Sequence, residues 1–212
     1  SFASGNLTVI LFAGFETTAD GLTFTLYLLA KNQDIQERLR REINEKGTDS
    51  EYLEMVRLKN VLNKHFMKLI SKVWMESLRL YSPVIKMIAR EACEDVEIGD
   101  LKIEKGTLVQ AAVWQIHYSE HIYEEPYAFK PERFSSKNRK NIHPAAFLPF
   151  GVGPRICLGM QLANFEAKLL LTKILTKFKI EMAEQTPKEL ELECHNVIMQ
   201  LKEPLFLKFV PL

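Results

Sequence analysis

One cysteine, Cys157, lies in a setting that suits chemistry better than packing. Gly151, Gly153 and Pro154 come shortly before it, so the backbone of this stretch can approach a ligand closely. Arg155 stands two residues before the cysteine, and an apolar helical pattern begins just after it. A cationic neighbour and a helix N-terminus both favour a thiolate over a thiol. The sequence therefore predicts a thiolate that could hold a metal, and haem iron accepts a single protein thiolate.

The two other cysteines, Cys93 and Cys194, have no glycines or basic partner beside them. We expect both to be buried cysteines with a packing role. The three cysteines are far apart and form no CxxC pair. This argues against structural zinc, a thioredoxin motif and a disulfide framework, and favours a reducing compartment.

The composition of the 212 residues is that of an ordinary soluble globular chain, with 47% hydrophobic and 26% charged residues. Lys and Arg number 28 against 27 Asp and Glu, which gives a formal net charge of +1. This near-balance argues against a nucleic-acid partner, because nucleic-acid binders usually show a clear basic excess. The absence of a charge excess also argues against a disordered chain.

The first thirty residues must form an element that is apolar on nearly every face. Residues 1–30 contain no Lys or Arg and only two acids, Glu16 and Asp20. We expect a long helix buried in protein rather than a membrane span, because charges in the middle of a span are costly. Such a helix needs protein on most sides, which indicates that the chain is a piece of something larger. No signal peptide is expected, because no basic segment precedes the apolar start.

The remaining patterns predict a mainly α chain with small β-sheets, an α+β fold. Helices are expected over residues 31–46, 54–81, 114–120 and 159–178, and short strands and hairpin turns over residues 84–113. Residues 125–154 contain five prolines and little periodicity, so we expect an irregular and functional stretch. Residues 179–212 predict short strands around loops.

The segment Phe150-x-x-Gly153-x-Arg155-x-Cys157-x-Gly159 resembles the haem-binding signature of the cytochrome P-450 family. Three further motifs occur in the family's order. They are the oxygen-activation motif of the long central helix (residues 13–18), the ExxR motif (residues 76–79) and the PERF motif (residues 131–134). The resemblance covers essentially all of residues 1–212. It implies the C-terminal portion of the P-450 fold, with the N-terminal half outside this sequence.

The resemblance assigns a role to each matching residue. Cys157 corresponds to the thiolate ligand of haem b (iron protoporphyrin IX), and Phe150 to the residue that shields this thiolate. Glu16 and Thr17 correspond to the pair that delivers protons and organises bound oxygen. The other implied cofactor contacts are Ala13, Gly153 and Gly159, with Arg155 and, through a looser alignment, Arg90 as partners of the haem propionates.

A second set of residues has a stabilising role in the family. Glu76 and Arg79 are three residues apart on one helix face, and the resemblance places them in a structural triad with Arg133.

His117 stands where the family often has His-Arg-Asp-Pro, although the following residues depart from that pattern. The five histidines show no ligand spacing with one another. Three lysines fit either a reductase-facing surface or a solvated face: Lys168, Lys173 and Lys177.

The function implied by the resemblance is that of a haem-thiolate monooxygenase. Such an enzyme inserts one oxygen atom from O₂ into a lipophilic organic substrate. Its electrons come from NADPH through NADPH-cytochrome P-450 reductase, with cytochrome b5 as a further candidate donor. The overall character of the sequence resembles the microsomal branch of the family, which oxidises drugs and steroids and includes thromboxane synthase. Because isomerases like thromboxane synthase usually lack the acid-Thr pair, Glu16 and Thr17 favour a monooxygenase. The implied location is the cytosolic face of the endoplasmic reticulum membrane, through an N-terminal anchor outside this chain.

Two alternatives of other classes stay open at this stage. One is a non-catalytic, truncated or pseudogene product that cannot hold haem by itself. The other is a haem or thiolate sensor, which would need the Cys157 loop but not Glu16 and Thr17.

One stretch, residues 56–72, has no counterpart in the family pattern. Without it, residue 73 would follow residue 55 directly at the start of the ExxR helix. The stretch opens with Val-Arg and is rich in residues with A/T-rich codons. It is interpreted as an intron translated in frame, with a genuine helical insertion as the alternative.

Overall fold

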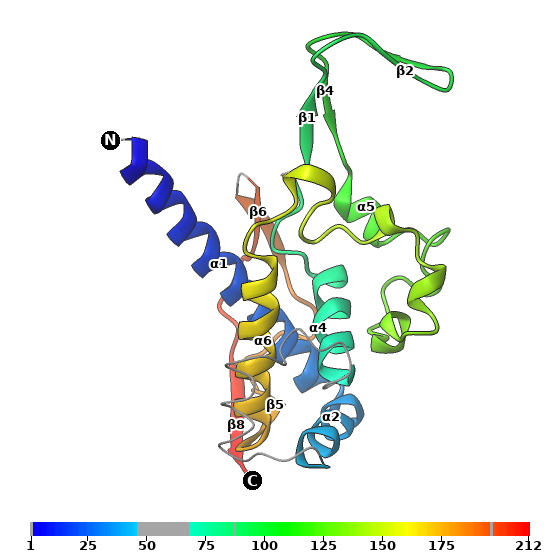
Figure 1. Ribbon diagram of the computed structural model, residues 1–212. Helices are drawn as coiled ribbons and strands as arrows, with labels where there is room; N and C mark the ends of the chain where they lie inside the picture. Colours follow the sequence, from blue (N-terminus) through cyan, green and yellow to red (C-terminus); the bar gives the residue numbers. More distant parts are fainter. Residues whose placement is uncertain (1, 46–67, 87, 196) are drawn as a thin grey trace.

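The computed structural model describes residues 2–45, 68–86, 88–195 and 197–212. Helices and pairs of short antiparallel strands follow one another in groups along the chain, which confirms the expected mixed α+β fold (Figure 1). Among the described residues, no helix is long and apolar enough to cross a membrane.

The N-terminal helices form as the sequence predicts. Helix α1 (Phe2–Lys31) is followed after one residue by α2 (Gln33–Glu45). The apolar residues of α2 recur every four positions, and all of them are buried: Ile35, Leu39 and Ile43. The C-terminal half of α1 is also largely buried, whereas residues 4–15 are exposed. The prediction of a helix covered along its whole length therefore holds within this chain only for its second half.

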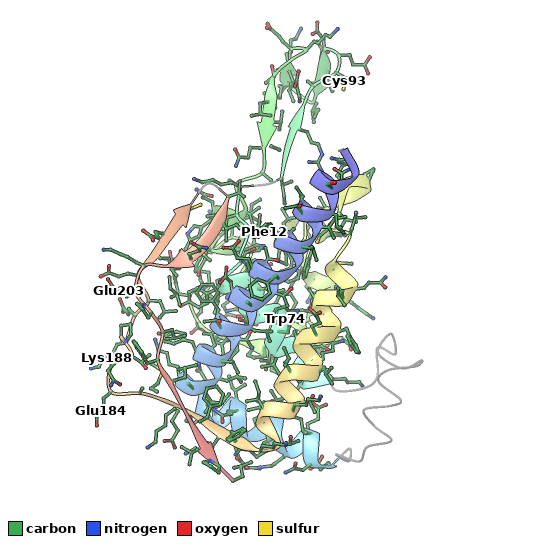
Figure 2. All side chains as sticks on the ribbon, turned by 90° about the vertical axis from the view of Figure 1, so that its left-hand side faces the viewer. Phe12, Trp74, Cys93, Glu184, Lys188 and Glu203 are labelled. Carbon is green, nitrogen blue, oxygen red and sulfur yellow. The ribbon has the colours of Figure 1, made fainter. Side chains whose placement is uncertain are left out.

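Helices α4 (Lys68–Leu80) and α6 (Met160–Leu175) pack against α1. Gly21 of α1 permits the close approach to α4, because a Cβ atom there would lie 2.8 Å from Cη2 of Trp74. The indole Nε1 of Trp74 in turn donates to Oδ1 of Asn164 on α6, at 2.8 Å. Figure 2 shows Trp74 behind α1, where the three helices meet. One side chain thus joins all three helices.

The described strands form four two-stranded antiparallel sheets. Two hairpin pairs project together from the helices (Figure 1): β1 (Ala89–Glu91) with β4 (Leu108–Gln110), and β2 (Val96–Ile98) with β3 (Leu101–Ile103). Gly99 and Gly106 turn this segment with φ of +60° and +85°, which favours glycine. The other two pairs follow α6: β5 (Phe178–Met182) with β8 (Leu207–Pro211), and β6 (Leu192–His195) with β7 (Ile198–Leu201).

The stretch between β4 and α6 is irregular, as predicted. It begins with a short helix, α5 (Val113–His117), one residue earlier than the sequence indicates. Four single 3₁₀ turns follow: η1 (Pro131–Phe134), η2 (Arg139–Asn141), η3 (Pro144–Ala146) and η4 (Gly153–Arg155). Three of them contain a proline in their first two positions, which suits a residue without an N–H.

The 56–72 stretch lies only partly within the described residues. Residues 56–67 are outside them, whereas residues 68–72 form the beginning of α4. Leu69 and Ile70 are buried in the core, with 8% and 0% exposure. Lys72 forms an ion pair with Glu132 at 2.7 Å.

Candidate functional site

The loop that carries Cys157 has a defined backbone. Gly151 and Gly153 adopt φ of +75° and +78°, in the left-handed region where other residues are strained. The backbone N–H of Cys157 donates to the carbonyl of Phe150 at 2.9 Å, which closes the loop. The thiol is exposed and lies three residues before α6, so the helix N-terminus is directed toward it.

Gly159 differs from the two glycines of the turn. Its φ is −81°, which any residue adopts, so backbone freedom does not require glycine there. A Cβ atom at this position would lie 3.9 Å from the Sγ of Cys157. Gly159 therefore leaves open the space next to the thiol, where a bound group could approach.

The residues just before the loop connect it to the core. Phe150 is half-buried against the cluster formed by Trp74, Leu78 and Ala167. The hydroxyl of Tyr123 donates to the carbonyl of Ala146 at 2.8 Å. The N–H of Leu148 donates to Nε2 of His117 at 2.9 Å, and both residues are buried. The two ends of the loop are therefore fixed, one by α6 and one by these contacts.

The structure brings together the three residues of the expected triad. Arg79 donates to both oxygens of Glu76, from Nε and Nη2, at 2.9 Å each. Arg133 on η1 adds a contact from Nε to Oε1 of Glu76 at 3.2 Å. The side chains of Glu76 and Arg79 are 0% exposed, so this bidentate pair is shielded from water.

The charge of Arg79 also holds the irregular stretch in place. Its guanidinium donates to the carbonyls of His117, at 2.7 Å, and Ala128, at 3.3 Å. It lies over the ring of Tyr123, 4.8 Å from the centroid. The N–H of Lys130 donates to Glu76 at 2.9 Å. The triad therefore organises the segment that leads into the Cys157 loop.

The residues of the expected oxygen-activation motif lie on one uninterrupted helix, α1. The hydroxyl of Thr17 donates to the carbonyl of Ala13, at 2.7 Å. The carboxylate of Glu16 accepts a hydrogen bond from Nε2 of Gln200 on β7, also at 2.7 Å. Gln200 has no signal in the sequence, because this contact joins residues 184 positions apart and depends on the register of β7.

Asp20, one turn after Glu16, has an unusual environment. Its Oδ2 is buried and has no hydrogen-bond partner among the described residues. Burial, with a smaller effect from the negative charge of Glu16, raises the pKa of Asp20 to about 6.

The two expected propionate partners are both exposed arginines. Arg155 lies in the 3₁₀ turn before Cys157. Arg90 lies on β1, where its Nη1 donates to the carbonyl of Ala89. Ile88, two residues before Arg90, lies 3.9 Å from the position that a Cβ of Gly151 would take, measured to its Cγ1. The base of β1 is therefore next to the Cys157 loop.

The expectation that Cys93 is buried is wrong. Cys93 is exposed and lies on the projecting hairpin, away from the helices (Figure 2). No core element covers this hairpin within the described chain, so its side chains meet solvent. Cys194 is half-buried on β6.

The groups present fit a haem that is held by a single protein thiolate. An exposed thiol next to a glycine faces open space, and two exposed arginines lie on the adjoining segments. Helix α1 adds a broad apolar surface, because Leu11, Phe12 and Phe15 are 63%, 68% and 79% exposed. Exposed apolar surface of this extent marks a binding site or an interface.

The family model described as "Cytochrome P450" matches residues 4–209. The chain belongs to the cytochrome P450 family. Among its relatives, cytochrome P450 3A31 of Mesocricetus auratus is 37% identical over 214 residues, which cover 96% of this chain and 39% of that protein. Cytochrome P450 3A41 of Mus musculus is 38% identical over 209 residues, with the same coverage. Cytochrome P450 3A12 of Canis lupus familiaris is 36% identical over 209 residues, again covering 96% and 39%.

This P450 chain thus spans about 39% of the length of the relatives it matches. The shared family confirms the resemblance that the four sequence motifs indicated. It is also consistent with the mixed helical and antiparallel architecture of the described residues.

Proposed function

We propose that this chain forms the haem-thiolate part of a monooxygenase. The enzyme inserts one oxygen atom from O₂ into a lipophilic organic substrate, with electrons from NADPH delivered through NADPH-cytochrome P-450 reductase. The observation that carries this proposal is the exposed thiol of Cys157, in a loop fixed at both ends, in a chain of the cytochrome P450 family.

The proposed cofactor contacts follow from the placement of the side chains. Cys157 would hold the iron through Sγ, and the guanidinium groups of Arg155 and Arg90 would pair with the propionates. Phe150 would limit the access of water from the side of the core. When bound, haem supplies an iron whose thiolate ligation favours cleavage of the O–O bond.

The proposed proton path runs along α1. Glu16 would help to deliver protons, and the hydroxyl of Thr17 would organise the hydrogen bonds of oxygen and water. Gln200 holds one carboxylate oxygen of Glu16 at 2.7 Å and leaves the other to take part in proton exchange. Thr17 is oriented by its bond to Ala13, so its oxygen can accept a hydrogen bond from a neighbour.

The proposed substrate is lipophilic because the surface around the site is apolar. The side chains of Leu7, Ile10 and Leu11 are more than 60% exposed on the N-terminal half of α1. A pocket formed over this surface would be lined mostly by aliphatic and aromatic groups, as in typical ligand sites.

The proposed location is the cytosolic face of the endoplasmic reticulum membrane, with cytochrome b5 as a second candidate electron donor. Lys168, Lys173 and Lys177 on and after α6 are the candidate contacts for a reductase. Burial lowers the pKa of Lys168, which makes Lys173 and Lys177, both exposed, the better candidates.

An alternative for the chain by itself is a product that does not hold haem. The specific observation in its favour is that residues 4–15 are exposed, so no second wall faces α1 among the described residues. We propose that the isolated chain lacks thiolate-ligated haem, whereas a full-length protein that contains it is the enzyme.

Substitution of Thr17 tests the proposed activity. In a full-length protein supplied with NADPH and reductase, Thr17→Ala should lower product formation roughly 100-fold, within the range of general acid–base effects. Thr23→Ala is the matched control, because the hydroxyl of Thr23 makes the same type of bond, to Ala19 at 2.9 Å. Undiminished turnover in Thr17→Ala would rule out this role, and a wild type that binds haem but forms no product would favour a haem sensor.

A further inference from the structure

His117 lies between the buried Glu76–Arg79 pair and the start of the Cys157 loop. It is the last residue of α5 and only 1% exposed. Its Nδ1 lies 3.1 Å from the carbonyl oxygen of Arg79, and its Nε2 lies 2.9 Å from the backbone nitrogen of Leu148. The guanidinium of Arg79 donates back to the carbonyl of His117 at 2.7 Å. The imidazole therefore bridges α4 and the segment before the loop.

The partners of the imidazole determine its protonation state. The N–H of Leu148 can only donate, so Nε2 must be unprotonated and accept. Nδ1 then carries the single proton and donates to the carbonyl of Arg79. A second proton would point at a peptide N–H in a buried site. Burial, with a smaller contribution from the positive charge of Arg79, lowers the pKa of His117 to about 4.

From Leu148 a series of backbone hydrogen bonds continues to the cysteine. The carbonyl of Leu148 accepts from the N–H of Gly151 at 3.1 Å. The carbonyl of Phe150 accepts from the N–H of Cys157 at 2.9 Å. The ring of His117 also stacks on Phe147, with centroids 5.8 Å apart. The position of Cys157 thus depends on where Leu148 is held.

The residues around the cysteine itself are not packed in the core. Residues 152–159 are exposed, so the core does not position them directly. Leu148, in contrast, is 4% exposed, and its N–H would have no water to bond if the imidazole were removed. A buried donor left without a partner favours a shift of the backbone toward solvent.

We infer that His117 is a positioning residue. Its Nε2 accepts a hydrogen bond from the N–H of Leu148, and this bond places the Cys157 loop relative to α4. The inference rests on the proposed function in one respect, that Cys157 is the iron ligand. It predicts that loss of the acceptor weakens thiolate ligation without removing the cysteine.

Two neutral amides at position 117 test the inference in a full-length protein. His117→Gln places an amide near the position of Nε2, where it can still accept from Leu148. His117→Asn is shorter and reaches the carbonyl of Arg79 but not Leu148. The readout is the spectrum of the reduced, CO-treated protein, in which thiolate-ligated haem gives a red-shifted Soret band. The measured quantity is the ratio of thiolate-ligated haem to haem without the red-shifted band. In His117→Gln this ratio should stay within about twofold of the wild-type ratio. It should fall roughly 5- to 30-fold in His117→Asn, as expected for an unpaired buried N–H.

Several outcomes would overturn the inference. Equal ratios in His117→Asn and wild type would show that the bond to Leu148 does not position the ligand. Equal losses in His117→Asn and His117→Gln would show that the imidazole acts only in packing. A wild-type protein without the red-shifted band would instead refute the proposed function. If His117→Asn does not fold, hydrogen exchange in the wild type decides: the amide of Leu148 should exchange far more slowly than that of Val152. Similar exchange at both amides would contradict the inference.

Discussion

The guanidinium of Arg79 is shielded from water, and its bidentate partner is the carboxylate of Glu76. A charge in such a place is tolerable because each of its three donor nitrogens has a partner, in Glu76 and the carbonyls of His117 and Ala128. The pair does not touch the proposed reacting groups. Its function at the residue scale is to fix the path of the chain toward Cys157.

Removal of the carboxylate charge should therefore be costly. Glu76→Gln leaves Arg79 buried without a counter-charge, and we expect a loss of about 3 to 5 kcal/mol in the free energy of unfolding. Glu132→Gln is the matched control, because Glu132 pairs with Arg38 and Lys72 but is about half exposed. Its loss should be below about 1 kcal/mol. Chemical unfolding of both variants checks the prediction, and similar losses in the two would contradict it.

The imidazole of His117 should make stability depend on pH. Its folded-state pKa, about 4, is below the ordinary value of 6.5, so the unfolded chain binds more protons between these pH values. The stabilising effect is complete above pH 6.5 and is lost as the pH falls toward 4, by about 3 kcal/mol in total. The charged groups near the imidazole of His117 are those of the triad, namely Arg79, Glu76 and Arg133. The other two neighbours of the ring, Phe147 and Leu148, carry no charge.

A comparison with His117→Gln isolates this effect. The pKa of Asp20 is shifted in the opposite direction, to about 6, so it opposes the trend between pH 4 and 6 in both proteins and cancels in the difference. The melting temperature of the wild type should fall more steeply than that of His117→Gln between pH 6.5 and 4.5. Parallel curves would show that His117 is not buried in the neutral form.

At the scale of elements, the beginning of α4 bears on the origin of residues 56–72. Two residues of α4 before Val73 are buried: Ile70, which is three positions before it, and Leu69, which is four positions before it. Without residues 56–72, Leu53 and Tyr52 would take these two positions in the sequence. Both replacements are apolar, so the shortened sequence keeps the helical pattern of α4.

We therefore predict that a full-length protein without residues 56–72 folds and binds haem at least as well as the longer form. The ion pair of Lys72 with Glu132 would be lost, but an exposed pair contributes at most about 1 kcal/mol. Haem content and melting temperature of the two forms check this, together with the sequence of the transcript. A spliced message that encodes residues 56–72, or a large loss of stability on their deletion, would contradict the intron interpretation.

The sequence predicted those elements whose cause is local. The four-residue spacing of Ile35, Leu39 and Ile43 indicated α2 and its buried face, and the structure confirms both. Contacts between distant residues gave no such signal. Gln36 looks like a surface residue of α2, yet it is 1% exposed and bonds both backbone groups of Ile180 at 2.9 Å.

The same limit applies to the site. The spacing of Glu76 and Arg79 placed them on one face, but their bonds to the segment before Cys157 depend on tertiary packing. His117 matched the family pattern in sequence, but its link to Leu148 could be found only from coordinates. The expectation for Cys93 is wrong because burial depends on whether a core covers the hairpin, and the residue types near Cys93 do not reveal this.

At the scale of the whole molecule, the described residues hold the candidate ligand but leave the N-terminal half of α1 uncovered. The N-terminal half of α1 is apolar and exposed, whereas its C-terminal half is packed among α4, α6 and the β5–β8 sheet (Figure 1). Covering this surface would stabilise a haem placed next to Cys157. This explains why we expect haem binding in a full-length protein and not in the isolated chain.

The most direct test of this account is the spectrum of the reduced, CO-treated full-length protein. We predict the red-shifted Soret band of thiolate-ligated haem in the wild type and in Cys93→Ala and Cys194→Ala, and its complete loss in Cys157→Ala. The isolated chain should not show the band. Survival of the band in Cys157→Ala would contradict the assignment of Cys157 as the iron ligand.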